Sequence, residues 1–222
     1  MPASAPIDTA PPRARLWAEF ICLFVGAPLA AAAAFGRFPL FPALIGFTLI
    51  GCGLLAVTPG WRWRALLRGP VFGEWRLILG FALVTAAAAL ALTLALRPDR
   101  LFALPLSRPD LWLMILLLYP ILSALPQELV FRALFFERYG ALFPNRAAAV
   151  AMNGAVFALA HLFFANWVAI AMTGFGGAIM GWAYIRRGAF GLALVLHTLA
   201  GWIIFTAGLG VYFYHGAIGA AP

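Results

Sequence analysis

The sequence predicts an all-α protein: a polytopic bundle of about seven to eight transmembrane helices, with a polar site in its C-terminal half. Of the 222 residues, 65% are hydrophobic and 10% are charged, and the mean hydropathy is +0.99. Soluble domains average about 45–50% apolar and about 25% charged residues. Apolar runs of spanning length, roughly 20 residues, also recur along the chain. Because lipid tolerates little besides helices, each run is predicted to be a helix.

The runs follow a short leading segment and are separated by helix-breaking residues. Residues 1–15 are rich in Pro and Ala and are predicted to be a disordered tail, followed by a single transmembrane domain over 16–222. The first run exceeds the signal-peptide core of about 7–15 residues, so we predict a retained span. The runs are 16–35, 40–58, 75–96, 111–136, 147–164, 167–185 and 189–210. Proline, glycine or asparagine separates them, as at Pro144 and Asn166.

The fourth run is too long for a plain span and is interrupted by Pro120 and Pro126. Proline removes a backbone donor and kinks a helix. Since the kink would come directly before Gln127 and Glu128, we predict backbone opened toward a cavity there. We place the site-bearing core at about 111–210.

The positive charge indicates topology. All fifteen basic residues are arginine, and most lie between apolar runs. This distribution is typical of membrane orientation and of contact with lipid headgroups, and we do not expect binding to nucleic acid. With a cytoplasmic N-terminus, ten arginines lie inside and four outside, which favours that orientation. The inside set is Arg13, Arg15, Arg62, Arg64, Arg68, Arg76, Arg138, Arg146, Arg186 and Arg187, and the outside set is Arg37, Arg97, Arg100 and Arg108.

A few strongly polar residues fall at membrane depth, where they are costly and usually functional. Glu128 and Arg132 are four residues apart, so on a helix they share a face and can form an ion pair. Each charge needs the other in a low dielectric. A pair that only fixes helix geometry is a serious alternative for Arg132, and a weaker one for Glu128, which has polar Gln127 beside it.

Two histidines lie in other spans. Neutral imidazoles together with a carboxylate make either a metal site or an acid–base set. With about 1.5 Å of rise per residue, Glu128 lies roughly 12 Å deep, His197 roughly 13 Å and His161 roughly 20 Å, so one cluster is feasible with tilt. Asn153 and Phe157 share a helix face with His161.

These residues resemble the motifs of the CPBP family, the intramembrane proteases that include type II CAAX prenyl endopeptidase-like, bacteriocin-processing and abortive-infection proteins. The family motifs are Glu-Glu-x-x-x-Arg, Phe-x-x-x-His and His-x-x-x-Asn, in separate helices. Here they correspond to Gln127-Glu128 with Arg132, to Phe157 with His161, and to His197 with Gly201. Order and spacing agree over 120–205, whereas the N-terminal spans are matched only in being hydrophobic.

Two positions depart from the family pattern. Gln127 replaces the first glutamate, which in the family is thought to activate water, and Gly201 replaces the asparagine that contributes to the polar site. The chain fits a branch that uses the Gln-Glu form, a Glu-to-Gln variant made to trap an inactive state, or a scaffold that has lost catalysis. We favour the first, because a variant made to inactivate would not also need Gly201.

The resemblance implies an endopeptidase that cleaves a membrane-anchored protein or peptide. Glu128 would act as general base, and His161 and His197 would bind a divalent metal with Glu128 or stabilise the oxyanion. We favour metal, as Zn²⁺, although no His-Glu-x-x-His motif is present. Gln127 would orient the carbonyl or the water. Compact loops and the Ala, Gly and Arg usage favour a prokaryotic inner membrane, and hence leader or C-terminal anchor processing.

Two other functions stay open from the sequence. A channel or transporter would also have Pro-broken helices and midplane polar residues, but no inverted repeat is visible and the polar residues concentrate in the C-terminal half. The other is a catalytically impaired scaffold. The sequence does not indicate an oligomeric state.

Overall fold

The structure is a computed structural model that describes residues 11–34 and 40–213, and within these ranges the chain is helical with no strand. The all-α prediction is therefore confirmed. The α-helices are α1 (Arg13–Ile21), α2 (Ala27–Ala33), α3 (Leu40–Ala56), α4 (Trp75–Leu96), α5 (Ala103–Ser107), α6 (Pro109–Tyr119), α7 (Leu125–Glu128), α8 (Arg146–Ala160), α9 (Trp167–Arg187) and α10 (Phe190–Ala207). Wider π-helical turns form η1 (Cys22–Gly26), η5 (Pro120–Ala124) and η6 (Leu129–Tyr139).

Seven of these helical stretches correspond to the seven predicted runs. Six are long and apolar enough to cross a membrane, and Phe41–Ala56 is a shorter apolar helix. The protein is an integral membrane protein. An eighth span has no counterpart among the described residues. The predicted tail was too long, since α1 already begins at Arg13, and residues 1–10 lie outside the described part of the chain.

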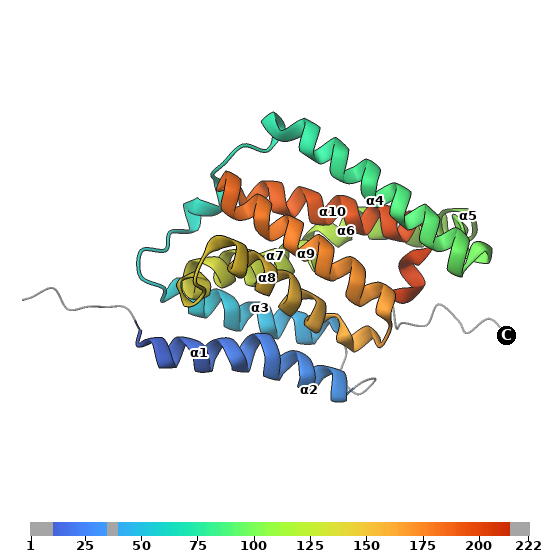
Figure 1. Cartoon of the computed structure of the whole chain (residues 1–222). Coiled ribbons are helices and arrows are strands. Elements are labelled where there is room, and N and C mark those ends of the chain that lie inside the picture. The colour runs from blue at the N-terminus through green and yellow to red at the C-terminus, as the bar shows by residue number, and fades with distance from the viewer. Residues whose placement is uncertain (1–10, 35–39, 214–222) are drawn as a thin grey trace, which may run out of the picture.

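The three C-terminal spans form the interior of the bundle. In their most apolar stretches, 39%, 39% and 44% of the residues are buried, against 17%, 11% and 17% in the three long spans before them. Figure 1 shows α4 along one side of the bundle against α10, with α1 and α2 along the opposite side. Large apolar side chains such as Leu49, Val84 and Leu117 remain exposed, as expected for a lipid-facing surface.

The fourth span is a continuous helical stretch, Pro109–Leu142, made of α6, η5, α7, η6 and a final short turn. The two prolines do not break it. Instead the winding widens into π-helical turns that begin at Pro120 and resume at Leu129, on both sides of Glu128. Because π-helical turns often occur at functional sites, this irregularity sets Glu128 apart from the rest of the span.

Glycines bring α8 and α9 into close contact. A Cβ at Gly154 would lie 2.7 Å from the Gly174 carbonyl oxygen, and one at Gly177 would lie 2.9 Å from the Phe157 ring. Only glycine fits such approaches. The contact fixes the face of α8 that carries Asn153 and Phe157.

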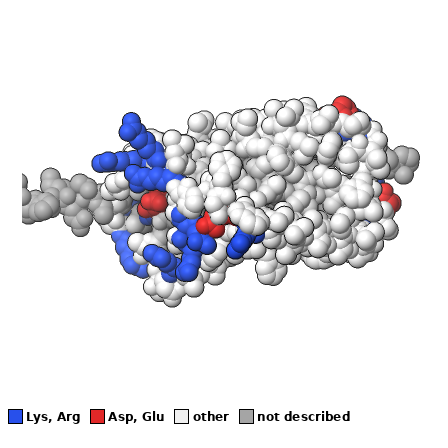
Figure 2. All heavy atoms as spheres, turned by 90° about the horizontal axis from the view of Figure 1, so that it is seen from above, with Lys and Arg blue, Asp and Glu red and all other residues white. Residues whose placement is uncertain are grey.

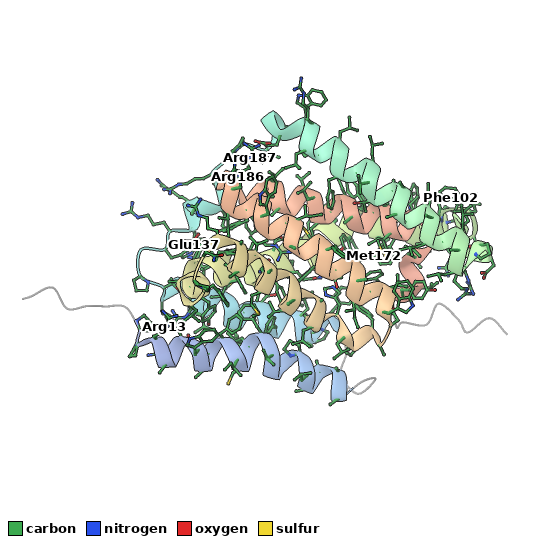
Figure 3. The ribbon with its side chains drawn as sticks, in the orientation of Figure 1. Arg13, Phe102, Glu137, Met172, Arg186 and Arg187 are labelled. Atoms are coloured by element: carbon green, nitrogen blue, oxygen red, sulfur yellow. The ribbon has the colours of Figure 1, made fainter. Side chains whose placement is uncertain are left out.

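The arginines gather at one end of the bundle. In Figure 2 most of the blue side chains lie at a single end, and in Figure 3 Arg13, Glu137, Arg186 and Arg187 lie at that end while Phe102 lies at the other. The opposite end holds Arg97, Arg100 and Arg108, which pair with Asp99 and Asp110. The predicted asymmetry is present, except that Arg37 lies outside the described residues.

One arginine of the predicted inside set was misplaced. Arg138 was expected in a loop, but it lies at the end of η6 with 5% of its surface exposed. It binds Glu19 of α1 through two nitrogen–oxygen contacts of 2.7 and 3.1 Å. The η6 helix continues beyond the predicted end of the run at 136, so Arg138 remains inside the bundle.

Candidate active site

The site is built around Glu128, which lies at the end of α7 between two π-helical stretches and is 0% exposed. Its carboxylate contacts basic groups on both sides. The Oε1 atom lies 2.8 Å from Nδ1 of His197 on α10, and Oε2 lies 3.0 Å from Nε of Arg132 on η6. A carboxylate so deep in an apolar bundle requires such partners.

The contact between Glu128 and Arg132 is an ion pair without an aligned hydrogen bond. Glu128 Oε2 and Arg132 Nε are both buried, and neither has a hydrogen-bond partner of good geometry among the described residues. The charge attraction remains at 3.0 Å, so Oε2 keeps lone pairs that are not committed to a donor. This oxygen can accept a proton without first breaking a directed hydrogen bond.

Arg132 is held by groups other than its acidic partner. Its Nη1 donates to Oδ1 of Asn153 at 2.6 Å, and its guanidinium carbon lies 4.8 Å from the ring centroid of Phe157. Asn153 in turn donates to the carbonyl of Phe131. Asn153 was predicted to share a helix face with Phe157 and His161 but was not predicted as a site residue.

The two predicted histidines both contact the Phe157 ring edge to face. The ring centroid of Phe157 is 4.6 Å from that of His161 and 5.6 Å from that of His197. His161 Nδ1 lies 2.7 Å from the Phe157 carbonyl oxygen. A carbonyl only accepts, so this nitrogen carries the proton and a neutral His161 presents Nε2 as an acceptor. In the described residues no hydrogen bond or ion pair joins His161 to Glu128.

Residues 109–203, from the start of α6 to a point four residues before the end of α10, match the family model described as Type II CAAX prenyl endopeptidase Rce1-like. This part of the chain is similar to the Rce1-like family. The match covers every predicted site residue and agrees with the resemblance found in the motifs. The family is a protease family. Comparisons with curated proteins and with solved structures found no significant match.

Within the Rce1-like segment, Gln127 faces a polar neighbour on its own helix. Its Nε2 donates to Oγ of Ser123 at 2.9 Å, one turn earlier. Its Oε1 is buried and has no hydrogen-bond partner in the part of the chain that the structure describes. Gln127 is half-buried and neutral, so it offers an unused acceptor beside Glu128 rather than a second carboxylate.

The Rce1-like residues do not form the predicted three-ligand metal set. Both oxygens of Glu128 face other side chains, and no group of three or more His, Cys, Asp or Glu residues fit to hold a metal occurs within 11–34 and 40–213. His161 and His197 each retain an Nε2, but two ligands are fewer than the three that catalytic zinc usually takes from protein. We derive no step through a metal, and the Zn²⁺ site stays a prediction.

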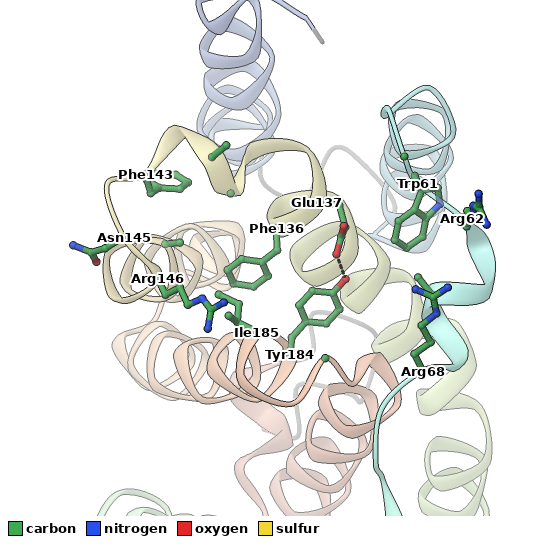
Figure 4. A pocket seen from close by; sticks show the side chains of 16 residues that line it. Trp61, Arg62, Arg68, Phe136, Glu137, Phe143, Asn145, Arg146, Tyr184 and Ile185 are labelled. Carbon is green, nitrogen blue, oxygen red and sulfur yellow. Dashed lines mark hydrogen bonds between the residues drawn. The ribbon is translucent and has the colours of Figure 1, made fainter. Parts of the chain in front are cut away.

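A cavity of about 920 Å³ opens at the arginine-rich end. Figure 4 shows the Tyr184 hydroxyl bonded to Glu137, with Arg62 and Arg68 to one side of this pair and Arg146 to the other. Neither Glu128 nor either histidine lines it. The cavity is therefore a separate feature of the bundle, next to the end of η6 but outside the cluster of Glu128, Arg132, His161 and His197.

Proposed function

We propose that the chain is an intramembrane endopeptidase that hydrolyses a peptide bond in a membrane-anchored protein or peptide, in leader or C-terminal anchor processing. One observation carries the proposal. Glu128 is fully buried between His197 and Arg132, and one of its oxygens has no aligned donor. A carboxylate retained in this position suits proton transfer.

Glu128 acts as the general base in this proposal. Its Oε2 takes a proton from water, the water oxygen bonds to the carbonyl carbon, and the carbonyl electron pair moves onto oxygen. When the C–N bond breaks, the same proton passes to the leaving amine. Arg132 stabilises the carboxylate between these events, and its bond to Asn153 keeps it in place.

His161 and His197 have different roles in this mechanism because their Nδ1 atoms have different partners. His197 donates from Nδ1 to Glu128 and orients the carboxylate, and in its protonated form it also offers an Nε2–H donor for the oxyanion. Neutral His161 presents an Nε2 acceptor that holds the attacking water or a substrate N–H. Gln127, with its free Oε1, orients the same groups.

The distribution of arginine supports a prokaryotic inner-membrane location with a cytoplasmic N-terminus. The arginine-rich end is also the end at which α1 begins, and positive residues favour the cytoplasmic face. The bilayer is then a partner throughout, since large apolar side chains cover the exterior.

The test uses purified protein in liposomes with three kinds of model substrate: a leader peptide, a C-terminal membrane anchor and a prenylated C-terminal peptide. We expect cleavage of the leader or anchor substrate by the wild type and none by Glu128→Gln. Absence of cleavage by the wild type, or equal cleavage by the variant, would overturn the proposal.

Metal dependence is measured in the same assay. Since both oxygens of Glu128 contact basic side chains, those of His197 and Arg132, and no third His, Cys, Asp or Glu joins them among the described residues, we expect dialysis against a chelator to leave the cleavage rate unchanged. Loss of cleavage on chelation with recovery on adding Zn²⁺ would instead support the zinc site predicted from the sequence.

A further inference from the structure

Gly201 on α10 lies directly against the phenol ring of Tyr119 on α6. A Cβ at position 201 would overlap Cε1 and Cζ of Tyr119 and would lie 2.7 Å from its hydroxyl oxygen. No side chain other than hydrogen fits there while the phenol is in place. Gly201 is fully buried and one turn from His197 on the same helix, so the Tyr119 hydroxyl occupies the position next to His197 on this face.

The position of Tyr119 is fixed by hydrogen bonds between α6 and α10. Trp112 Nε1 donates to the Thr206 hydroxyl at 2.9 Å, and Trp202 Nε1 donates to the Leu116 carbonyl at 3.0 Å. These two contacts lie one and two turns before Tyr119 along α6 and hold the antiparallel helices in one register. The contact between Tyr119 and Gly201 therefore follows from the register of α6 and α10, which these two hydrogen bonds hold.

Tyr119 also faces the proposed catalytic groups. Its ring centroid lies 5.9 Å from that of His197, and its hydroxyl interacts electrostatically with Glu128 and with the Ser123 side chain. Ser123 receives the hydrogen bond from Gln127. Tyr119, Ser123 and Gln127 thus form a polar row at four-residue intervals on the fourth span, and the row ends beside Glu128.

We propose that Tyr119 is a further catalytic residue whose hydroxyl donates a hydrogen bond to the oxyanion of the tetrahedral intermediate, with Gly201 providing the space for it. The inference rests on the proposed endopeptidase function. A phenol hydroxyl is protonated at neutral pH and donates well. In this step Tyr119 keeps its proton: water supplies the new C–O bond, Glu128 receives the water proton, and the negative charge on oxygen accepts the Tyr119 hydrogen bond.

The experiment compares Tyr119→Phe with the wild type and with Tyr212→Phe, a matched change away from the polar cluster, on the substrate that the wild type cleaves. Removing one oxyanion donor lowers kcat by about 10²-fold or more, so we expect that fall for Tyr119→Phe with KM changed less than about twofold. Tyr212→Phe should retain wild-type kcat. The melting temperature of each variant checks that the fold is intact.

Two further variants test the position of the hydroxyl and its replacement by another donor. Gly201→Ala keeps the hydroxyl but displaces it, so kcat should fall as in Tyr119→Phe. The double variant Tyr119→Ala/Gly201→Asn puts an amide donor into the vacated space and should recover part of the kcat lost in Tyr119→Ala. Wild-type kcat in Tyr119→Phe while Glu128→Gln is inactive would overturn the role of Tyr119 and leave the proposed function standing. If the wild type cleaves nothing, both fall.

Discussion

Two Glu–Arg pairs share the helical stretch Pro109–Leu142 and are built differently. The Glu19–Arg138 pair joins helices 119 residues apart in sequence, and its bonds are directed: Arg138 donates twice to Glu19 and once to Thr58, and Tyr139 also donates to Glu19. The Glu128–Arg132 pair is local, with 0% exposure of both side chains, and its facing atoms share no aligned hydrogen bond.

This difference in hydrogen bonding indicates different roles. The Glu19–Arg138 pair stabilises the fold, whereas the Glu128–Arg132 pair leaves a carboxylate oxygen able to accept a proton. When every lone pair of a carboxylate accepts a directed bond, protonation breaks those bonds and costs stability. Glu19 is in that condition. Glu128 has one oxygen on His197 and another that faces charge without a directed donor, so it can take up a proton with less disruption.

The same substitution at both pairs gives the strongest contrast. Glu128→Gln removes the proposed base, and general-base catalysis contributes about 10²–10⁴-fold, so we expect kcat to fall by that amount. Amide and carboxylate have nearly the same shape, so the variant should still insert and fold, at a cost in stability of about 3–5 kcal/mol because Arg132 loses its counter-charge. Rates in liposomes, normalised to folded protein, measure the effect.

Glu19→Gln should lower stability and leave catalysis intact. A fully buried pair costs about 3–5 kcal/mol when one partner is removed. The Glu19 side chain is 17% exposed and Gln retains an acceptor, so we expect a loss on the order of 2 kcal/mol. The cleavage rate per folded molecule should stay unchanged. Denaturant titration in detergent measures stability, and a fall in kcat comparable to that of Glu128→Gln would contradict the division of roles.

Asn153→Ala tests whether the Glu128–Arg132 pair depends on the hydrogen bond that Asn153 accepts from Arg132. Without the amide, Arg132 loses a 2.6 Å bond and the Phe131 carbonyl loses its donor, so we expect kcat to fall about 10–100-fold through misplacement of Arg132. Asn145→Ala is the control on the same helix, because Asn145 only caps α8 through Ala148. It should cost about 1 kcal/mol of stability and no activity. Equal kcat values for the two variants would show that catalysis does not depend on the bond between Arg132 and Asn153.

The smallest effect is expected at an exposed pair. A side-chain hydrogen bond from Arg97 lowers the pKa of Asp99 below its ordinary value. A lowered folded-state pKa means that the contribution is present above the unfolded pKa and is lost as the pH falls through the folded one. Asp99→Asn should therefore differ from the wild type in melting temperature only marginally near neutral pH and not at all in acid. A shift as large as that of Glu19→Gln would refute this.

Local spacing accounts for most of what the sequence predicted correctly. Apolar runs and their breakers located the helices, and Asn166 does cap α9 where a break was expected. The four-residue spacing of Glu128 and Arg132 predicted their contact, which the structure shows at 3.0 Å. His197 and Phe157 also meet beside Glu128 and Arg132. The order of the three motifs predicted this meeting, and no single span did.

The features that the sequence could not predict depend on tertiary register. Arg138 lies far from Glu19 in sequence and was assigned to a loop, because no local pattern indicates their contact. Tyr119 meets Gly201 only because α6 and α10 pack in a particular register. The four-residue spacing of Tyr119, Ser123 and Gln127 was the one available signal for this polar row. It is a weak signal, because in any helix residues four apart lie on one face.

The unequal ends of the bundle give the molecule an electrical polarity. Within 11–34 and 40–213, ten arginines and three glutamates belong to one end, and three arginines paired with two aspartates belong to the other. Moving one elementary charge across a potential of 100 mV changes its energy by about 2.3 kcal/mol. Each arginine without an acidic neighbour therefore adds electrical work against turning the bundle over in an energised membrane. In the proposed orientation, with the arginine-rich end in the cytoplasm, the potential itself then holds the direction in which the Glu128 site faces.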